Sequence, residues 1–173
     1  MLLPRLHHPL TFLTNHTPQY KTAFYTYYLP IAIGVIIDGI VDEKVFDLAK
    51  VICCTMSEYF QIQDDYLDCY GNEKQIGKVG TDIENNKCSW MVVQALNMAN
   101  EKQRKTLEQN YGKWDEKKVK VVKDVYEELD TSKMFSVYEE QSFVNIQDTL
   151  DKVTMMPKEV FSLLFKKVYK RQK

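Results

Sequence analysis

The amino-acid sequence predicts an all-α protein built around one helical domain. Only six glycines and five prolines occur among 173 residues, and so few helix-breaking residues favour long helices over many short strands. Between Phe60 and Asp68 the polar residues recur at helical spacing. With 45% hydrophobic residues and a formal net charge of -1, a chain of this length can bury a core of its own. No apolar run reaches the roughly 18 to 20 residues that a membrane span requires.

Residues 1–18 differ from the rest of the chain in composition. They hold all three histidines and three of the five prolines, and the first acidic residue of the protein is Asp38. An acid-free start is typical of a mitochondrial targeting segment, but three prolines disfavour the amphipathic helix that such a segment forms. We therefore expect a disordered leader. The four cysteines lack C-x-x-C spacing, which indicates reduced thiols in a cytoplasmic protein, with a mitochondrial location as the alternative.

The stretch from Gln19 to Ile37 is almost wholly apolar and aromatic, which predicts a helix in the protein interior. Pro30 should kink this helix, because proline lacks an N–H donor and its ring clashes with the preceding turn. Lys21 is the only charged residue of the stretch. Its side chain either snorkels toward solvent at the start of the helix or serves a functional site.

Local signals place the remaining helices. Asp42–Tyr70 should form one long helix with Asp42 as its N-cap, Gly71–Gly77 a loop, and the capping-box sequence Thr81–Glu84 the start of another helix. There Asp82 lies in the first turn, where the helix dipole favours a carboxylate, or serves only as a cap. Later helices are expected at 88–100, 101–111, 116–130 and 132–153, and from Pro157 onward. Four lysines of the amphipathic helix from residue 116 should be solvated: Lys117, Lys118, Lys120 and Lys123.

Carboxylates gather on one side of the long helix near its C-terminal end. At about 100° per residue, the side chains of Gln61, Asp64, Asp65 and Asp68 share that side, and apolar residues flank them. Three like charges one turn apart repel each other, and partial desolvation raises their cost, so a cation is expected among them. Mg²⁺ is the natural candidate, because it takes hard oxygen ligands and is held by one or two carboxylates with phosphate and water. The alternative is an acidic helix patch.

Five short segments, in this order and spacing, resemble the farnesyl diphosphate synthases, which are short-chain trans-prenyltransferases. These segments are Tyr20–Tyr25, Phe60–Asp68, Gly77–Ile83, Asn86–Trp90 and Tyr169–Lys173. The likeness extends from about Gln19 to the last residue and covers only the C-terminal half of such an enzyme. It implies that residues 19–173 form part of an isoprenoid-synthase helical bundle, whereas residues 1–18 do not match.

The resemblance implies an enzyme of isoprenoid biosynthesis, which uses Mg²⁺ to condense isopentenyl diphosphate with dimethylallyl or geranyl diphosphate. The implied metal ligands are Asp64, Asp65 and Asp68. The implied catalytic residues are Lys21, Thr22, Tyr25, Gln61 and Lys78, and the implied substrate contacts are Lys87 and Arg171. Lys21 and Lys78 would bind the allylic diphosphate, and Thr22 and Tyr25 would line the site where the allylic cation forms. Arg171 would fold over isopentenyl diphosphate, in a lid that Gln172 weakens because relatives carry a second arginine there.

Two features of the family pattern are missing from this sequence. It contains neither a second D-D-x-x-D motif nor an Arg-Arg pair. One hypothesis is a prenyltransferase, either a truncated chain or one completed by a partner that supplies the missing half, with a homodimer expected. The other is a non-catalytic relative that binds diphosphate or dimerises. The basic C-terminal tail has two further interpretations, a solvated terminus or a weak nucleic-acid contact, but no nucleic-acid partner is expected.

Overall fold

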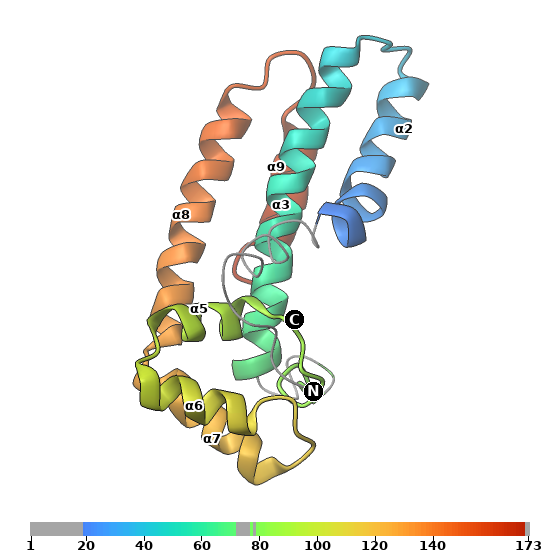
Figure 1. The fold of residues 1–173 in the computed structure, drawn as a ribbon. Coiled ribbons are helices and arrows are strands. Elements are labelled where there is room, and N and C mark those ends of the chain that lie inside the picture. The colour runs from blue at the N-terminus through green and yellow to red at the C-terminus, as the bar shows by residue number, and fades with distance from the viewer. Residues whose placement is uncertain (1–18, 72–76, 78, 172–173) are drawn as a thin grey trace. The chain divides into compact units, whose positions relative to one another are not determined.

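The structure, a computed structural model, describes residues 19–71, 77 and 79–171, with the backbone alone at residues 19–21. Every regular element in this part of the chain is a helix (Figure 1), which confirms the all-α prediction. The elements are the π-helix η1 (Gln19–Tyr28) and the α-helices α2 (Leu29–Ile37), α3 (Glu43–Tyr70), α5 (Trp90–Met98), α6 (Glu101–Asn110), α7 (Glu116–Glu128), α8 (Thr131–Asp151) and α9 (Glu159–Val168). No helix among the described residues combines the length and apolarity needed to cross a bilayer. The expected leader, residues 1–18, lies outside the described residues.

The first helical stretch changes from π-helical to α-helical geometry just before Pro30, and the predicted kink at this proline stays a prediction. The π-helix η1 ends at Tyr28, and α2 follows with Pro30 in its first turn. Proline is tolerated there because the first N–H groups of an α-helix have no partner within the helix.

The expectation that this stretch lies in the protein interior is only half right. One face of α2 is buried through Ile31, Ala32 and Val35, but Ile33 is 48% exposed and Ile37 is 81% exposed. Nothing among the described residues covers that second face. The apolar helix α2 therefore packs against the core through one face only.

The long helix α3 forms where the sequence predicts it. Asp42 caps its start, with Asp42 Oδ1 accepting a hydrogen bond from the backbone N–H of Lys44 at 2.9 Å. Short polar side chains at this position satisfy N–H groups that would otherwise lack a partner. At the other end, Lys123 Nζ donates to the carbonyl oxygen of Cys69 at 2.8 Å. The prediction that Lys123 is simply solvated is therefore wrong, because it satisfies a carbonyl in the last turn of α3.

The predicted helix start at Thr81 is also wrong. Residues 82–86 form turns, and the next helix, α5, begins at Trp90 with the hydroxyl of Ser89 accepting from Val92 N at 3.5 Å. The side chain of Thr81 accepts a hydrogen bond from Asn85 Nδ2 at 3.0 Å instead of capping a helix. The later helices match their predicted positions within a few residues, the usual uncertainty at helix ends.

The described residues belong to two compact units, 62–137 and 19–61 with 138–171. In the second of these, residues of α3, α8 and α9 form a continuous apolar core with η1 and α2. Its largest fully buried side chains are Ile52, Met56, Tyr59, Ile146, Leu150, Phe161 and Phe165. Each fully buried side chain of this size stabilises the fold by about 1.5–3 kcal/mol.

The unit of residues 62–137 has a core of its own. The ring of Tyr66 stacks on Phe135 with centroids 4.0 Å apart and planes 7° apart. Met91, Leu107, Val122 and Tyr126 are almost fully buried within the same unit. This core supports the last turns of α3, which carry the three aspartates.

Candidate functional site

The three aspartates of α3 differ in exposure. Asp65 is buried, at 5% exposure, whereas Asp64 and Asp68 are half-buried. Their positions follow from the helix, because residues four apart lie one above the other and the residue next to Asp64 points about 100° away. The three carboxylates therefore meet different surroundings, although they belong to one motif.

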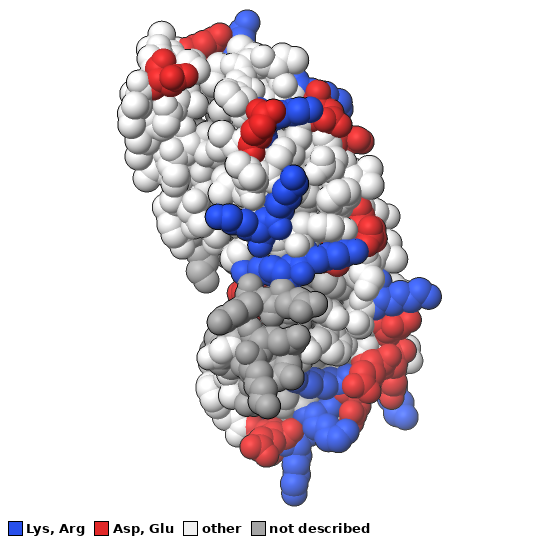
Figure 2. All heavy atoms as spheres, turned by 180° about the vertical axis from the view of Figure 1, so that it is seen from behind, with Lys and Arg blue, Asp and Glu red and all other residues white. Residues whose placement is uncertain are grey.

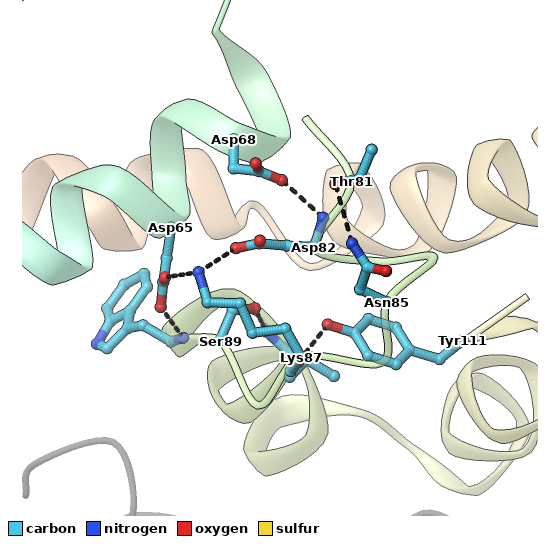
Figure 3. A network of polar contacts seen from close by, with 10 residues as sticks. Asp65, Asp68, Thr81, Asp82, Asn85, Lys87, Ser89 and Tyr111 are labelled. Carbon is cyan, nitrogen blue, oxygen red and sulfur yellow. Dashed lines mark hydrogen bonds and ion pairs between the residues drawn. The ribbon is translucent and has the colours of Figure 1, made fainter. Parts of the chain in front are cut away.

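Asp65 is bound to the segment that leads into α5. Its Oδ1 accepts from Lys87 Nζ at 2.9 Å, and its Oδ2 accepts from the backbone N–H of Trp90 at 2.7 Å (Figure 3). Trp90 is the first residue of α5, where N–H groups lack helical partners and the helix dipole attracts a negative charge. The burial of this carboxylate is thus compensated by one ion pair and one helix N-terminus.

Lys87 bridges two carboxylates. Besides Asp65, its Nζ binds Asp82 Oδ2 at 2.6 Å, and its side chain is 34% exposed. Burial lowers the pKa of Lys87, but the charge of Asp65 and hydrogen bonds to both carboxylates outweigh it and hold the pKa above its usual value. The backbone is held as well, because the hydroxyl of Tyr111 donates to the carbonyl of Lys87 at 2.8 Å. Lys87 is therefore a fixed cation at this site.

Asp68 is held by the same segment through a different contact. Its Oδ2 accepts from the backbone N–H of Asp82 at 2.8 Å, as Figure 3 shows. Gly80 passes so close to Asp68 that a Cβ at position 80 would collide with the Asp68 carbonyl oxygen and lie 2.9 Å from Oδ2. The turn after α3 can thus approach the helix only because residue 80 is a glycine.

Gln61 and Arg171 lie in the unit of residues 19–61 and 138–171. Gln61 is half-buried. The guanidinium carbon of Arg171 lies 3.8 Å from the centroid of the Phe60 ring, which is a cation–π contact. The backbone N–H of Lys170 donates to the hydroxyl of Tyr59 at 3.2 Å. These contacts attach the C-terminal residues to the turn of α3 that precedes the aspartates.

The remaining predicted residues lie at or beyond the edge of what the structure describes. Thr22 is half-buried and Tyr25 is 64% exposed, both within η1. Lys21 belongs to the same helix, but its side chain lies outside the described part, and so does the whole of Lys78. The assigned roles of these four residues stay predictions.

The aspartate oxygens suit a magnesium ion only if a diphosphate supplies further ligands. Within the described residues, no group of three or more Asp, Glu, His or Cys side chains is arranged to hold a metal ion. Asp65 turns toward Lys87 and α5, and this separates it from its neighbours. Magnesium sites of phosphate-binding enzymes need only one or two carboxylates, because phosphate and water complete the shell. The half-buried Asp64 and Asp68 satisfy that smaller requirement.

Sequence reasoning missed several residues of this network. Asp82 was expected in a first helical turn, but its carboxylate pairs with Lys87 and its N–H holds Asp68. The roles of Tyr111 and the Trp90 N–H leave no signal in the sequence, since both contacts join segments more than 20 residues apart. Among the described residues, the structure brings together Asp65, Asp68 and Lys87 of the predicted set.

Comparisons with known proteins give a consistent result. Residues 15–129 match the family model of polyprenyl synthetase. The chain is 49% identical to farnesyl pyrophosphate synthase of Gallus gallus over 156 residues, which cover 90% of this chain and 42% of that protein. The corresponding protein of Homo sapiens is 48% identical, with 90% and 37% covered. The chain thus spans less than half the length of these curated relatives.

Solved structures agree with the sequence relatives. T. brucei farnesyl diphosphate synthase complexed with risedronate matches with a TM-score of 0.85 and 34% identity, over 99% of this chain and 51% of that chain. The predicted partial isoprenoid-synthase bundle is therefore confirmed at the level of the fold. Together with the family match over more than half of its residues, this shows that the chain belongs to the polyprenyl synthetase family.

Proposed function

We propose that this chain is the diphosphate-binding part of a prenyltransferase that condenses isopentenyl diphosphate with dimethylallyl or geranyl diphosphate in a magnesium-dependent reaction. One observation carries the proposal. In a member of the polyprenyl synthetase family, half-buried Asp64 and Asp68 are presented on a turn of α3 that a neighbouring segment holds in place. The names of the similar proteins, farnesyl pyrophosphate synthases, support the same reaction class.

The proposed roles follow from charge and position. Mg²⁺ bound with the allylic diphosphate would supply positive charge that neutralises the leaving pyrophosphate. Asp64 and Asp68 are the proposed ligands, and Lys21 and Lys78 are predicted to contribute positive charge that offsets the developing negative charge. The sequence also predicts Lys87 as a diphosphate contact, but its two ion pairs leave at most one of its three N–H donors for that role.

The other residues shape the reacting end of the substrates. Thr22 and Tyr25 are proposed to line the place where the allylic cation forms, and Gln61 stays a predicted catalytic residue on the side of α3 that carries the aspartates. Arg171, stacked on Phe60, is proposed to close over isopentenyl diphosphate. Aromatic walls of this kind keep water away from a reactive cation.

The first prediction concerns Asp64. Asp64→Ala should weaken binding of inorganic pyrophosphate about tenfold in the presence of MgCl₂, because a carboxylate that supports the metal is lost. Asp47→Ala is the matched control, since Asp47 is exposed on the same helix. Isothermal titration calorimetry on the folded chain measures both. Binding that is equal in the two variants, or absent from the wild-type chain, would contradict the proposal.

Turnover separates the enzyme from the non-catalytic alternative. The purified chain is mixed with MgCl₂, isopentenyl diphosphate and dimethylallyl diphosphate, and the products are identified by mass. Product that disappears with Asp64→Ala establishes a prenyltransferase. Pyrophosphate binding without product identifies a binding relative, or a chain that needs a partner for catalysis.

An apolar face supports the proposed association with a second chain. Leu29, Ile33, Ile36 and Ile37 of α2 are each about half or more exposed, and they lie on one side of the helix. On the side where α2 lies, Figure 2 shows a stretch of surface with few charged side chains. Exposed apolar faces of this kind mark contact surfaces in soluble proteins. We propose that this face mediates dimerisation.

The second prediction tests that face. The double variant Ile33→Asp/Ile36→Asp should convert a self-associating chain to a monomer, because two buried charges without partners oppose association. Val144→Asp is the control, since Val144 is 54% exposed on a different helix, α8. Size-exclusion chromatography with light scattering reports the mass of each. A wild-type chain that is monomeric at micromolar concentrations would speak against dimerisation and for a different partner.

A further inference from the structure

The segment from Gly80 to Trp90 forms a closed set of contacts with the last turns of α3. Asp65 binds Lys87, Lys87 binds Asp82, and the Asp82 N–H binds Asp68 (Figure 3). Asp65 and Asp68 belong to the same helix, so these contacts form a closed ring. Such a ring restrains every member, because no single contact can lengthen without strain on the others.

Lys87 occupies the central position of this ring. Its ammonium group has three N–H donors, and the two carboxylates take up two of them at 2.9 and 2.6 Å. The ammonium group of Lys87 joins the carboxylate of Asp65 on α3 to the carboxylate of Asp82 in the following turn. Without its charge, the carboxylates of Asp65 and Asp82 would lose a common cation in a partly desolvated place.

The position of Asp82 depends on this bridge. Its carbonyl accepts from Lys87 N at 3.0 Å, so the turn and the ion pair together fix the residue. The Asp82 N–H then aims at Asp68 Oδ2 from 2.8 Å. A hydrogen bond from a backbone N–H to one oxygen restrains the whole carboxylate, because its two oxygens are rigidly linked.

We infer that Lys87 is a positioning residue, which orients Asp68 through Asp82 and withdraws Asp65 from metal binding. The inference rests on the proposed function and deepens it. Asp64 and Asp68 then remain as the carboxylates that face a magnesium–diphosphate complex, and Asp65 serves the framework. The motif thus divides its three aspartates between binding and support.

Magnesium dependence of pyrophosphate binding tests the inference on the full chain. Lys87→Met, which keeps the length of the side chain, should raise the magnesium concentration at half-maximal binding about tenfold, as loss of a group that supports a metal ligand does. Lys87→Arg should restore most of the wild-type value. Val122→Ala is the control for a purely structural effect, because Val122 is fully buried within the same unit. This variant should lose stability without a change in the magnesium midpoint.

Two results would overturn the inference. If Lys87→Met weakens pyrophosphate binding equally at all magnesium concentrations, Lys87 contacts the diphosphate directly. If Lys87→Met shifts the midpoint no more than Val122→Ala does, Lys87 has a structural role only.

Amide hydrogen exchange tests the same inference without a ligand. Lys87→Met, or Asp82→Asn if that variant does not fold, should accelerate exchange at the Asp82 amide at least about tenfold relative to Val122→Ala. Unchanged protection would refute the positioning role even if pyrophosphate binds. A different outcome separates the two proposals. If the wild-type chain binds no pyrophosphate, the proposed function is refuted. Faster exchange in Lys87→Met would then still support the positioning role.

Discussion

Asp65→Ala is expected to lower the free energy of unfolding by about 3 kcal/mol, since removing one member of a buried ion pair is strongly destabilising and Lys87 keeps only Asp82 as a partner. Asp65 is only 5% exposed, and its loss strips an acceptor from both Lys87 Nζ and the Trp90 N–H. The value lies at the lower end of the usual range because the Lys87 side chain keeps 34% exposure and can still reach water. Urea unfolding followed by circular dichroism measures the change.

Two comparisons make this result specific. Asp65→Asn retains an acceptor for the Trp90 N–H and loses only the charge, so its effect should be smaller than that of the alanine variant. Asp47→Ala, an exposed position on the same helix, should change stability by no more than about 0.5 kcal/mol. Equal stability of Asp65→Ala and wild type would show that this carboxylate does not hold α5 against α3.

Gly80→Ala is expected to destabilise the chain by about 2–3 kcal/mol, because the added methyl group has no room. Its Cβ would collide with the carbonyl oxygen of Asp68. The turn would have to move away from α3, and the hydrogen bond from the Asp82 N–H to Asp68 would lengthen. We therefore also expect weaker pyrophosphate binding in the presence of MgCl₂, measured by calorimetry.

The matched control is a glycine with space around it. A Cβ at Gly34, within the exposed face of α2, would meet no atom within 4 Å. Gly34→Ala should raise the free energy of unfolding by about 0.5–1 kcal/mol, because alanine loses less conformational entropy in a helix. If both variants changed stability in the same direction and by similar amounts, the close approach of Gly80 to Asp68 would not limit the fold.

Helix positions were largely predictable from the sequence because their signals are local. Asp42 marks the start of α3 by a contact within two residues, as the sequence predicts, and capping preferences of this kind apply wherever such residues occur. The family resemblance, drawn from five short segments, was confirmed by the comparisons with known proteins. Side-chain types at fixed spacing were sufficient to place the aspartates on one helix.

Contacts between distant segments could not be predicted from the same signals. At Thr81, a capping-box sequence competes with the Asp82–Lys87 and Asp82–Asp68 contacts, and the structure resolves the competition in favour of a turn. Similarly, Lys123 turned from a solvated side chain into a cap because the end of α3 lies next to α7. Hydrophobic periodicity identifies faces but not the neighbours that cover them, which is why the exposed face of α2 was unforeseen.

Residue types and spacing therefore established the helices, the family and the acidic motif, because each depends on local hydrogen bonding or on direct similarity. The different surroundings of the three aspartates depended on folding. Asp65 is buried where Lys87 and the N–H of Trp90 bind it, whereas Asp68 accepts a hydrogen bond from a backbone N–H fourteen residues away. The surroundings of a buried carboxylate are set by the hydrogen-bond donors that approach it, and packing between remote segments determines which donors those are.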